Sequence, residues 1–193
     1  MTPLRDEADW EAVAADASAI GELQAFYEAN PEYWHLVHGH APVPDEATQE
    51  FEARPPAEMS YSAVPMWLIR DRASGRLIGE VSAVTDPLAP GVTHLGFFIV
   101  DKSRQGSGFA AEVYGAYEAW AIAHGARWLR LGVVEGNQRA HRFWERIGYR
   151  EVRRRHDYEI GSLRHTLLVM VKAVPPHTFD DYLALVPRDR PEN

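Results

Sequence analysis

The stretch of sequence that decides the fold is Val100-Asp101-Lys102-Ser103-Arg104-Gln105-Gly106-Ser107-Gly108-Phe109-Ala110. It follows an apolar run over residues 95–100, which is typical of a β-strand, and it leads into an amphipathic helical pattern. Glycines at such a junction leave backbone N–H groups uncovered at the positive end of the helix dipole. The stretch therefore predicts a binding site for a phosphate-bearing cofactor.

Two other kinds of phosphate-binding loop fit this stretch less well. A P-loop requires lysine and then serine or threonine after its last glycine, whereas Phe109 stands there in this chain. The glycines also match a dinucleotide-binding fingerprint, with Glu135 as its ribose-binding acid. In that fingerprint, however, the first glycine directly follows the strand. Here five residues separate Val100 from Gly106, so the dinucleotide fingerprint is disfavoured.

Two motifs resemble those of the GCN5-related N-acetyltransferase (GNAT) family. The first is Gln105-x-x-Gly108-x-Ala110, placed after a strand that ends in valine. The second is Asn137-x-x-Ala140-x-x-Phe143-Trp144-x-x-x-Gly148-Tyr149, and the resemblance covers roughly residues 60–172. It implies an α/β fold with a mixed, mostly antiparallel sheet of six or seven strands, splayed between the fourth and fifth strands, and with helices on both faces.

The resemblance also implies that acetyl-CoA is the acyl donor and that its pantetheine arm lies in the splay. The main chain of Phe98 and Val100 would pair with this arm, while the glycine loop holds the pyrophosphate. The expected acetyl-CoA-binding residues are Phe98, Ile99, Val100, Gln105, Gly106, Ser107, Gly108, Phe109, Ala110, Asn137, Ala140, Phe143 and Trp144. No metal is expected.

Direct attack on the thioester requires a neutral amine, so a group must accept the proton of the amine. His94, at the start of the fourth expected strand, is one candidate because its ordinary pKa suits neutral pH. Alternation places His94 on the same face as Gly96 and Phe98. Glu135, at the end of the fifth expected strand, is the second candidate catalytic residue. The plainer alternatives are a packed strand histidine and a solvated loop acid.

Trp144 occupies the position at which the family often has a tyrosine that protonates the leaving thiolate. The indole N–H is a hydrogen-bond donor, but it cannot deliver a proton as an acid. Either a nearby tyrosine, Tyr149 or Tyr158, replaces the missing acid, or the thiolate leaves unassisted.

The segment before the two motifs is expected to form the acceptor pocket. In the resembling family the region around the first two helices covers the substrate cleft, and here it contains the expected substrate-binding residues Tyr33, Trp34 and His35. The segment also contains His38 and His40. These histidines have no carboxylate partner at helical spacing, so a metal site is disfavoured.

Hydrophobic periodicity and turn residues place the elements along the chain. The expected strands cover residues 10–13, 66–70, 77–84, 94–100, 127–134, 151–159 and 166–172. The expected helices follow Asp16 or Ser18, Asp45, Gly108 and Asn137, and residues 33–37 are expected to be irregular.

Length and composition predict a single domain, followed by a proline- and charge-rich tail over residues 175–193. The resemblance implies that this domain, over residues 1–174, is an N-acetyltransferase domain with its motif-bearing core at about 60–172. The net charge of −8 disfavours nucleic acid and anionic membranes as partners. The chain has no cysteine, which excludes an acyl-cysteine intermediate.

The absence of a signal-peptide pattern in residues 1–10 and of any long apolar run predicts a cytoplasmic protein. A homodimer is an open alternative to a monomer.

These observations predict an acyl-CoA-dependent N-acyltransferase that transfers acetyl from acetyl-CoA to a primary amine of a small molecule by direct attack. The alternative is a non-catalytic acyl-CoA-binding sensor or regulatory module, because the usual tyrosine is absent and no single residue is marked as the base.

Overall fold

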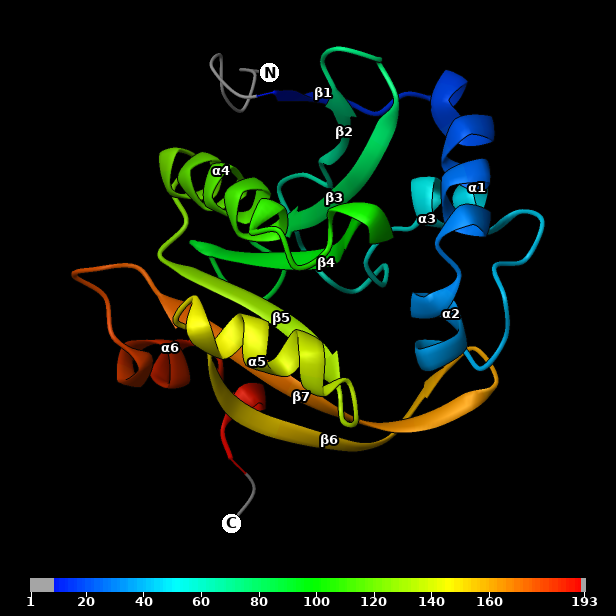
Figure 1. Ribbon diagram of the computed structural model, residues 1–193. Coiled ribbons are helices and arrows are strands. Elements are labelled where there is room, and N and C mark those ends of the chain that lie inside the picture. The colour runs from blue at the N-terminus through cyan, green and yellow to red at the C-terminus, as the bar shows by residue number, and fades with distance from the viewer. Residues whose placement is uncertain (1–8, 192–193) are drawn as a thin grey trace.

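The computed structural model describes residues 9–191, and seven strands form one sheet in the order β1-β2-β3-β4-β5-β7-β6 (Figure 1). The strands are β1 (Trp10–Ala14), β2 (Met66–Asp71), β3 (Leu77–Thr85), β4 (Val92–Val100), β5 (Trp128–Val134), β6 (Arg150–Ile160) and β7 (Leu163–Ala173). β4 and β5 pair in parallel, and the other neighbouring strands pair antiparallel. The expected mixed, mostly antiparallel sheet is confirmed.

Helices cover both faces of this sheet, as the sequence predicts. They are α1 (Ile20–Ala29), α2 (Glu32–Val37), α3 (Glu46–Glu52), α4 (Phe109–Ala123), α5 (Gln138–Arg146) and α6 (Phe179–Leu185), with short 3-10 turns η1 (Ala17–Ala19), η2 (Lys102–Arg104) and η3 (Pro187–Asp189). α4 and α5 lie on one face, and α1–α3 lie at the other (Figure 1). No helix in the described part of the chain has the length and apolar character needed to cross a membrane.

Parts of two predictions fall outside the described residues. Residues 1–8 and 192–193 belong to the expected domain and tail, and the first eight also make up most of the segment searched for a signal peptide. Those parts stay predictions.

The alternation of side chains in β5 shows why the sheet is covered on both faces. Leu129, Leu131 and Val133 belong to the apolar core beneath α4 and α5. Trp128 points the other way and packs against Tyr182 of α6. Both faces of the strand are therefore buried, which explains the nearly continuous apolar sequence of β5.

A β-bulge at Gly96 changes the direction of the side chains in β4. Phe97 pairs with Ser82 and Leu95 pairs with Ala83, so Gly96 is an extra residue in the ladder. Leu95 packs in the core under α4 and α5, and Phe98 packs against the same core, whereas Phe97 lies under α1–α3. The expectation that His94 shares a face with Phe98 is therefore wrong, because the bulge intervenes between them.

Two segments are more ordered than the sequence suggests. Residues 33–37 form most of α2, which starts after Pro31, a residue that favours the first turn of a helix. The segment after residue 174, expected to be a tail, contains α6 and η3. Tyr182 and Val186 of this segment join a core cluster with Trp128, and Asp189 is fully buried.

Candidate active site

The strands β4 and β5 separate after three residue pairs. Pairing runs from Val92↔Trp128 to His94↔Arg130, and beyond this point the strands diverge while β5 continues to pair with β7 (Figure 1). The N–H of Asp101 donates to Ile78 O at 2.9 Å, so alternation directs the main chain of Phe98 and Val100 into the opening. The splay therefore offers unpaired backbone groups to an extended arm that carries amides.

The glycine loop follows β4 and ends at the first turn of α4. Gly106 has φ +83°, Gly108 has φ +93°, and no atom of the described chain lies within 4 Å of a Cβ added to either residue. Gly108 is also the N-cap of α4. Within residues 9–191, the N–H groups of Gly106, Ser107 and Gly108 meet no hydrogen-bond acceptor. The loop is an open cradle at a helix N-terminus, which fits a pyrophosphate.

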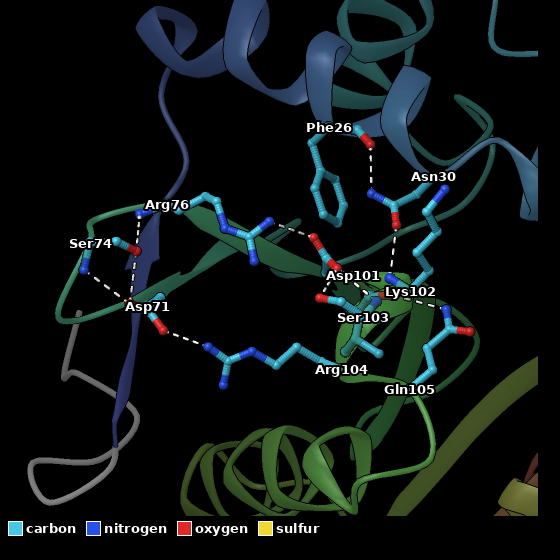
Figure 2. A network of polar contacts seen from close by, with 11 residues as sticks. Phe26, Asn30, Asp71, Ser74, Arg76, Asp101, Lys102, Ser103, Arg104 and Gln105 are labelled. Atoms are coloured by element: carbon cyan, nitrogen blue, oxygen red, sulfur yellow. Dashed lines mark hydrogen bonds and ion pairs between the residues drawn. The ribbon is translucent and has the colours of Figure 1, made fainter.

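Asp101 anchors the start of this loop (Figure 2). Its Oδ1 accepts the N–H of Ser103 at 2.8 Å, and its Oδ2 accepts Arg76 Nη1 at 2.8 Å. Burial alone would raise the pKa of Asp101, but the hydrogen bonds from Ser103 and Arg76 hold this pKa below its ordinary value. The carboxylate therefore stays ionised and fixes the turn.

Two further contacts hold the loop from the side of α1 and β2 (Figure 2). Buried Asn30 donates to Phe26 O at 2.9 Å and accepts the N–H of Lys102 at 2.9 Å. Arg104 donates to Asp71 Oδ2 at 2.5 Å. Sequence reasoning missed Asn30 and Asp71, because their partners lie far away in the chain and no local spacing marks them.

The second motif caps helix α5 and joins it to the loop. Asn137 Oδ1 accepts the N–H of Ala140 at 3.1 Å, so Asn137 is the N-cap of α5. Gln105 accepts Arg139 Nη1 at 2.6 Å and donates to Val100 O at 3.1 Å. The expected cofactor residues Gln105 and Asn137 are thus placed at the two sides of the opening.

We expect Asn137→Ala to destabilise the fold by about 1 kcal/mol, the usual cost of a lost N-cap, and to weaken acetyl-CoA binding. Thermal denaturation measures the first effect, and calorimetric titration with acetyl-CoA measures the second. Lower stability with unchanged affinity would assign Asn137 to the helix cap alone.

Aromatic side chains pack between β4 and α5. The ring centroid of Phe98 lies 6.3 Å from that of Phe143 and 5.5 Å from that of Trp144. The ring centroid of Tyr149 lies 5.5 Å from that of Trp144. Tyr149 is 2% exposed and accepts the hydroxyl of Tyr114 at 3.2 Å. Burial raises the pKa of Tyr149 well above its ordinary value, which argues against this residue as the acid for the leaving thiolate. Tyr158 is exposed on β6.

His94 sits where β4 and β5 are still paired. Its Nδ1 lies 3.2 Å from Arg130 Nη1, and Arg130 in turn donates to both carboxylate oxygens of buried Asp189. Burial, together with the positive charge of Arg130, lowers the pKa of His94 to about 3. A group with this pKa is a weak proton acceptor, so the role of His94 as the base stays a prediction that its surroundings do not favour.

Glu135 lies at the far end of β5, on the side of β6. Its Oε1 accepts Arg154 Nη1 at 2.6 Å, and Arg154 also donates to Glu151 at 2.8 Å. Because the carboxylate is already paired with a cation, its role as a base also stays a prediction.

Across the sheet from α4 and α5, a small cavity opens among α1–α3 and β4. It is lined by Tyr27, Tyr33, Trp34, His38, Glu46, Glu50 and Phe97. The expected substrate residues Tyr33 and Trp34 line this cavity. His35 is instead exposed on α2, and the histidine that lines the cavity is His38. In the described part of the chain, no three His, Asp or Glu side chains form a metal-binding group.

Sequence reasoning missed the acids of this cavity. Ser82 donates to Glu50 Oε1 at 3.2 Å, and Tyr27 donates to Glu80 Oε2. Burial raises the pKa of Glu50, and this effect outweighs the hydrogen bond from Ser82, which lowers the pKa. The negative charge of Glu46 raises the pKa of Glu50 further. Burial and the charge of Glu50 raise the pKa of Glu80 well above its ordinary value, which favours its uncharged form.

A sheet splayed between a parallel pair of strands, with a glycine loop leading from the fourth strand into a helix, defines the GNAT class of acetyltransferases. The sequence profile described as "Acetyltransferase (GNAT) family" matches residues 23–149, which is more than half of the chain. The chain belongs to the GNAT acetyltransferase family. The match supports N-acetyltransferase activity in general.

Solved structures agree with this fold. An acetyltransferase from Thermus thermophilus superposes with a TM-score of 0.67 at 18% identity, covering 86% of this chain and 98% of that one. Spermidine N-acetyltransferase from Vibrio cholerae, solved with CoA and spermine, gives 0.66 at 16% identity, with 86% and 95% covered. Ribosomal-protein-S5-alanine acetyltransferase from Vibrio fischeri gives 0.69 at 12%, with 92% and 100% covered. No curated protein sequence matches the chain.

Proposed function

We propose that this protein transfers acetyl from acetyl-CoA to a primary amine of a small molecule by direct attack. The observation that carries the proposal is the combination of the open glycine cradle and the splay that begins after His94↔Arg130. The cradle supplies free N–H groups for a pyrophosphate, and the splay supplies backbone groups for a pantetheine arm.

The acceptor would approach from the opposite face of the sheet. The cavity beside Phe97 lies on that face, and Phe98, whose backbone faces the splay, is the next residue. Donor and acceptor would therefore meet at the bulge of β4 without either crossing the core. The neighbour solved with CoA and spermine is an acetyltransferase of an amine, which agrees with this class of acceptor.

The absence of cysteine makes the test direct. A thiol reagent added to the protein, acetyl-CoA and an amine detects only released CoA, because the protein has no thiol of its own. We expect CoA release that depends on both the amine and the protein. Tight binding of acetyl-CoA without release for any amine would favour the non-catalytic binding module instead. A cytoplasmic location and a homodimer stay predictions.

A further inference from the structure

The cavity among α1–α3 and β4 is small and has aromatic walls. Its volume is about 40 Å³, and its rings are those of Tyr27, Tyr33, Trp34 and Phe97. The centroids of Tyr27 and Trp34 are 4.5 Å apart, and those of Tyr33 and Phe97 are 4.9 Å apart. A space of this size accepts one ammonium-sized group, and the faces of such rings attract cations.

The wall of this cavity carries two acids, and none of the described residues that line it is Lys or Arg. Glu46 is tied down, since its Oε2 accepts the N–H of Val43 at 3.1 Å. Within residues 9–191, the Glu50 carboxylate accepts one hydrogen bond, from Ser82. Glu80, which accepts the hydroxyl of Tyr27 behind the cavity wall, is fully buried, and its Oε1 has no hydrogen-bond partner in the described part of the chain. The carboxyl groups at and behind this wall are therefore incompletely satisfied.

Glu50 also lies near the bulge of β4. Ser82, its hydrogen-bond partner, pairs with Phe97, and a Cβ added to Gly96 would lie 3.4 Å from Ser82 Oγ. Gly96 is the bulge, two residues after the last pair of the parallel ladder, His94↔Arg130. The carboxylate therefore lies beside the bulge of β4, on the face of the sheet that carries the cavity.

We infer that this cavity holds the ammonium group of the acceptor and that Glu50 accepts the proton which this group must lose before it attacks. This inference rests on the proposed function. The acceptor class that follows is a primary alkylamine with no carboxylate beside its amine. A carboxylate on the acceptor would face the negatively charged side chains of Glu46 and Glu50. The acidic protein, with a net charge of −8, also attracts such cations.

The proton balance of this step is simple. The ammonium gives one proton to the Glu50 carboxylate, and the neutral nitrogen forms the C–N bond with the thioester carbonyl carbon. The C–S bond breaks, and the thiolate takes the second proton lost by the nitrogen. Glu50 finally releases its proton to water, so the products are the acetamide, CoA thiol and one free proton.

The test compares two amines of one shape. Ethylamine is an ammonium ion at neutral pH, whereas trifluoroethylamine is largely neutral and needs no proton acceptor. We expect Glu50→Gln to lower the kcat/KM for ethylamine by about 100-fold, the scale of general base catalysis. Because trifluoroethylamine is already neutral, Glu50→Gln should lower its kcat/KM by less than about 3-fold. The Kd of the variant for acetyl-CoA should be unchanged. The matched control is Glu52→Gln, an exposed acid of the same helix.

The pH profile gives a second readout. Because the pKa of Glu50 is raised, the kcat/KM for ethylamine should fall with decreasing pH at a midpoint above that of an ordinary glutamate, and Glu50→Gln should lose this limb. The titratable groups around the Glu50 carboxylate are Tyr27 of α1, Tyr33 of α2, His38, Glu46 of α3 and Glu80 of β3.

Three results would overturn the inference. Equal losses for both amines would make Glu50 a binding or folding residue, and parental activity of Glu50→Gln would remove it from the reaction. An acid limb that persists in Glu50→Gln but disappears in His94→Gln would make His94 the acceptor. If the parent protein releases CoA with neither amine, the proposed function fails for this acceptor class, which separates that failure from one confined to Glu50.

Discussion

Gly108→Val should weaken the binding of acetyl-CoA at least 10-fold, the largest effect that we expect at the cofactor site. Gly108 has φ +93°, a conformation that strains a β-branched residue, and it caps α4 with open space around it. The valine side chain would occupy the space through which a phosphate approaches the N–H groups of the loop. Calorimetric titration with acetyl-CoA measures the loss, and a 10-fold change in Kd corresponds to about 1.4 kcal/mol.

The matched control for this substitution is Gly125→Val. Gly125 has φ +90° and the same open surroundings, but it lies beyond the other end of α4. Both variants should therefore lose stability by backbone strain, and only Gly108→Val should lose affinity. Equal affinity of the two variants for acetyl-CoA would mean that the cofactor does not contact the loop.

Asp189→Ala should lower the melting temperature by roughly 10 °C, because it leaves a buried cation without its partner. Asp189 is fully buried and accepts Arg130 Nε at 2.7 Å and the hydroxyl of Tyr182 at 2.6 Å. The loss of one member of such a pair costs about 3–5 kcal/mol. Asp180→Ala, at an exposed position of α6, is the control and should melt like the parent protein.

The effect of Asp189→Ala should depend on pH. Burial alone would raise the pKa of Asp189, but its bonds with Arg130 and Tyr182 hold this pKa below the ordinary value. A depressed pKa in the folded state stabilises the protein above the unfolded-state pKa, and this stabilisation is lost as the pH falls through the folded-state value. The difference in stability between parent and variant should therefore be full at neutral pH and shrink in acid. A constant difference would show that lost packing, rather than the charge of Asp189, sets the cost.

The sequence predicts the elements around the glycine loop well, because they are built from local patterns. The glycine loop, its flanking strand and α4 are neighbours in the chain, so periodicity and turn residues suffice to place them. The cap at Asn137 is equally local. These elements lie within a residue or two of their expected positions.

The proposed acceptor side depends on contacts between distant residues. Glu50 reaches Ser82 of β3 only after α3 has packed over the sheet, and nothing in the pattern of α3 distinguishes Glu50 from exposed Glu52. The bulge at Gly96 is a single inserted residue that alternation does not reveal, and it turns His94 away from Phe98. Arg130 and Asp189 are paired although 59 positions separate them.

The central claim is that acetyl-CoA occupies the splay while the amine occupies the aromatic cavity on the opposite face. A crystal structure of the protein with CoA and ethylamine tests it most directly. We predict the pyrophosphate at the N–H groups of Gly106–Gly108, the pantetheine arm along Phe98–Val100, and the amine within hydrogen-bonding distance of Glu50. CoA bound elsewhere, with no ligand between β4 and β5, would contradict this account.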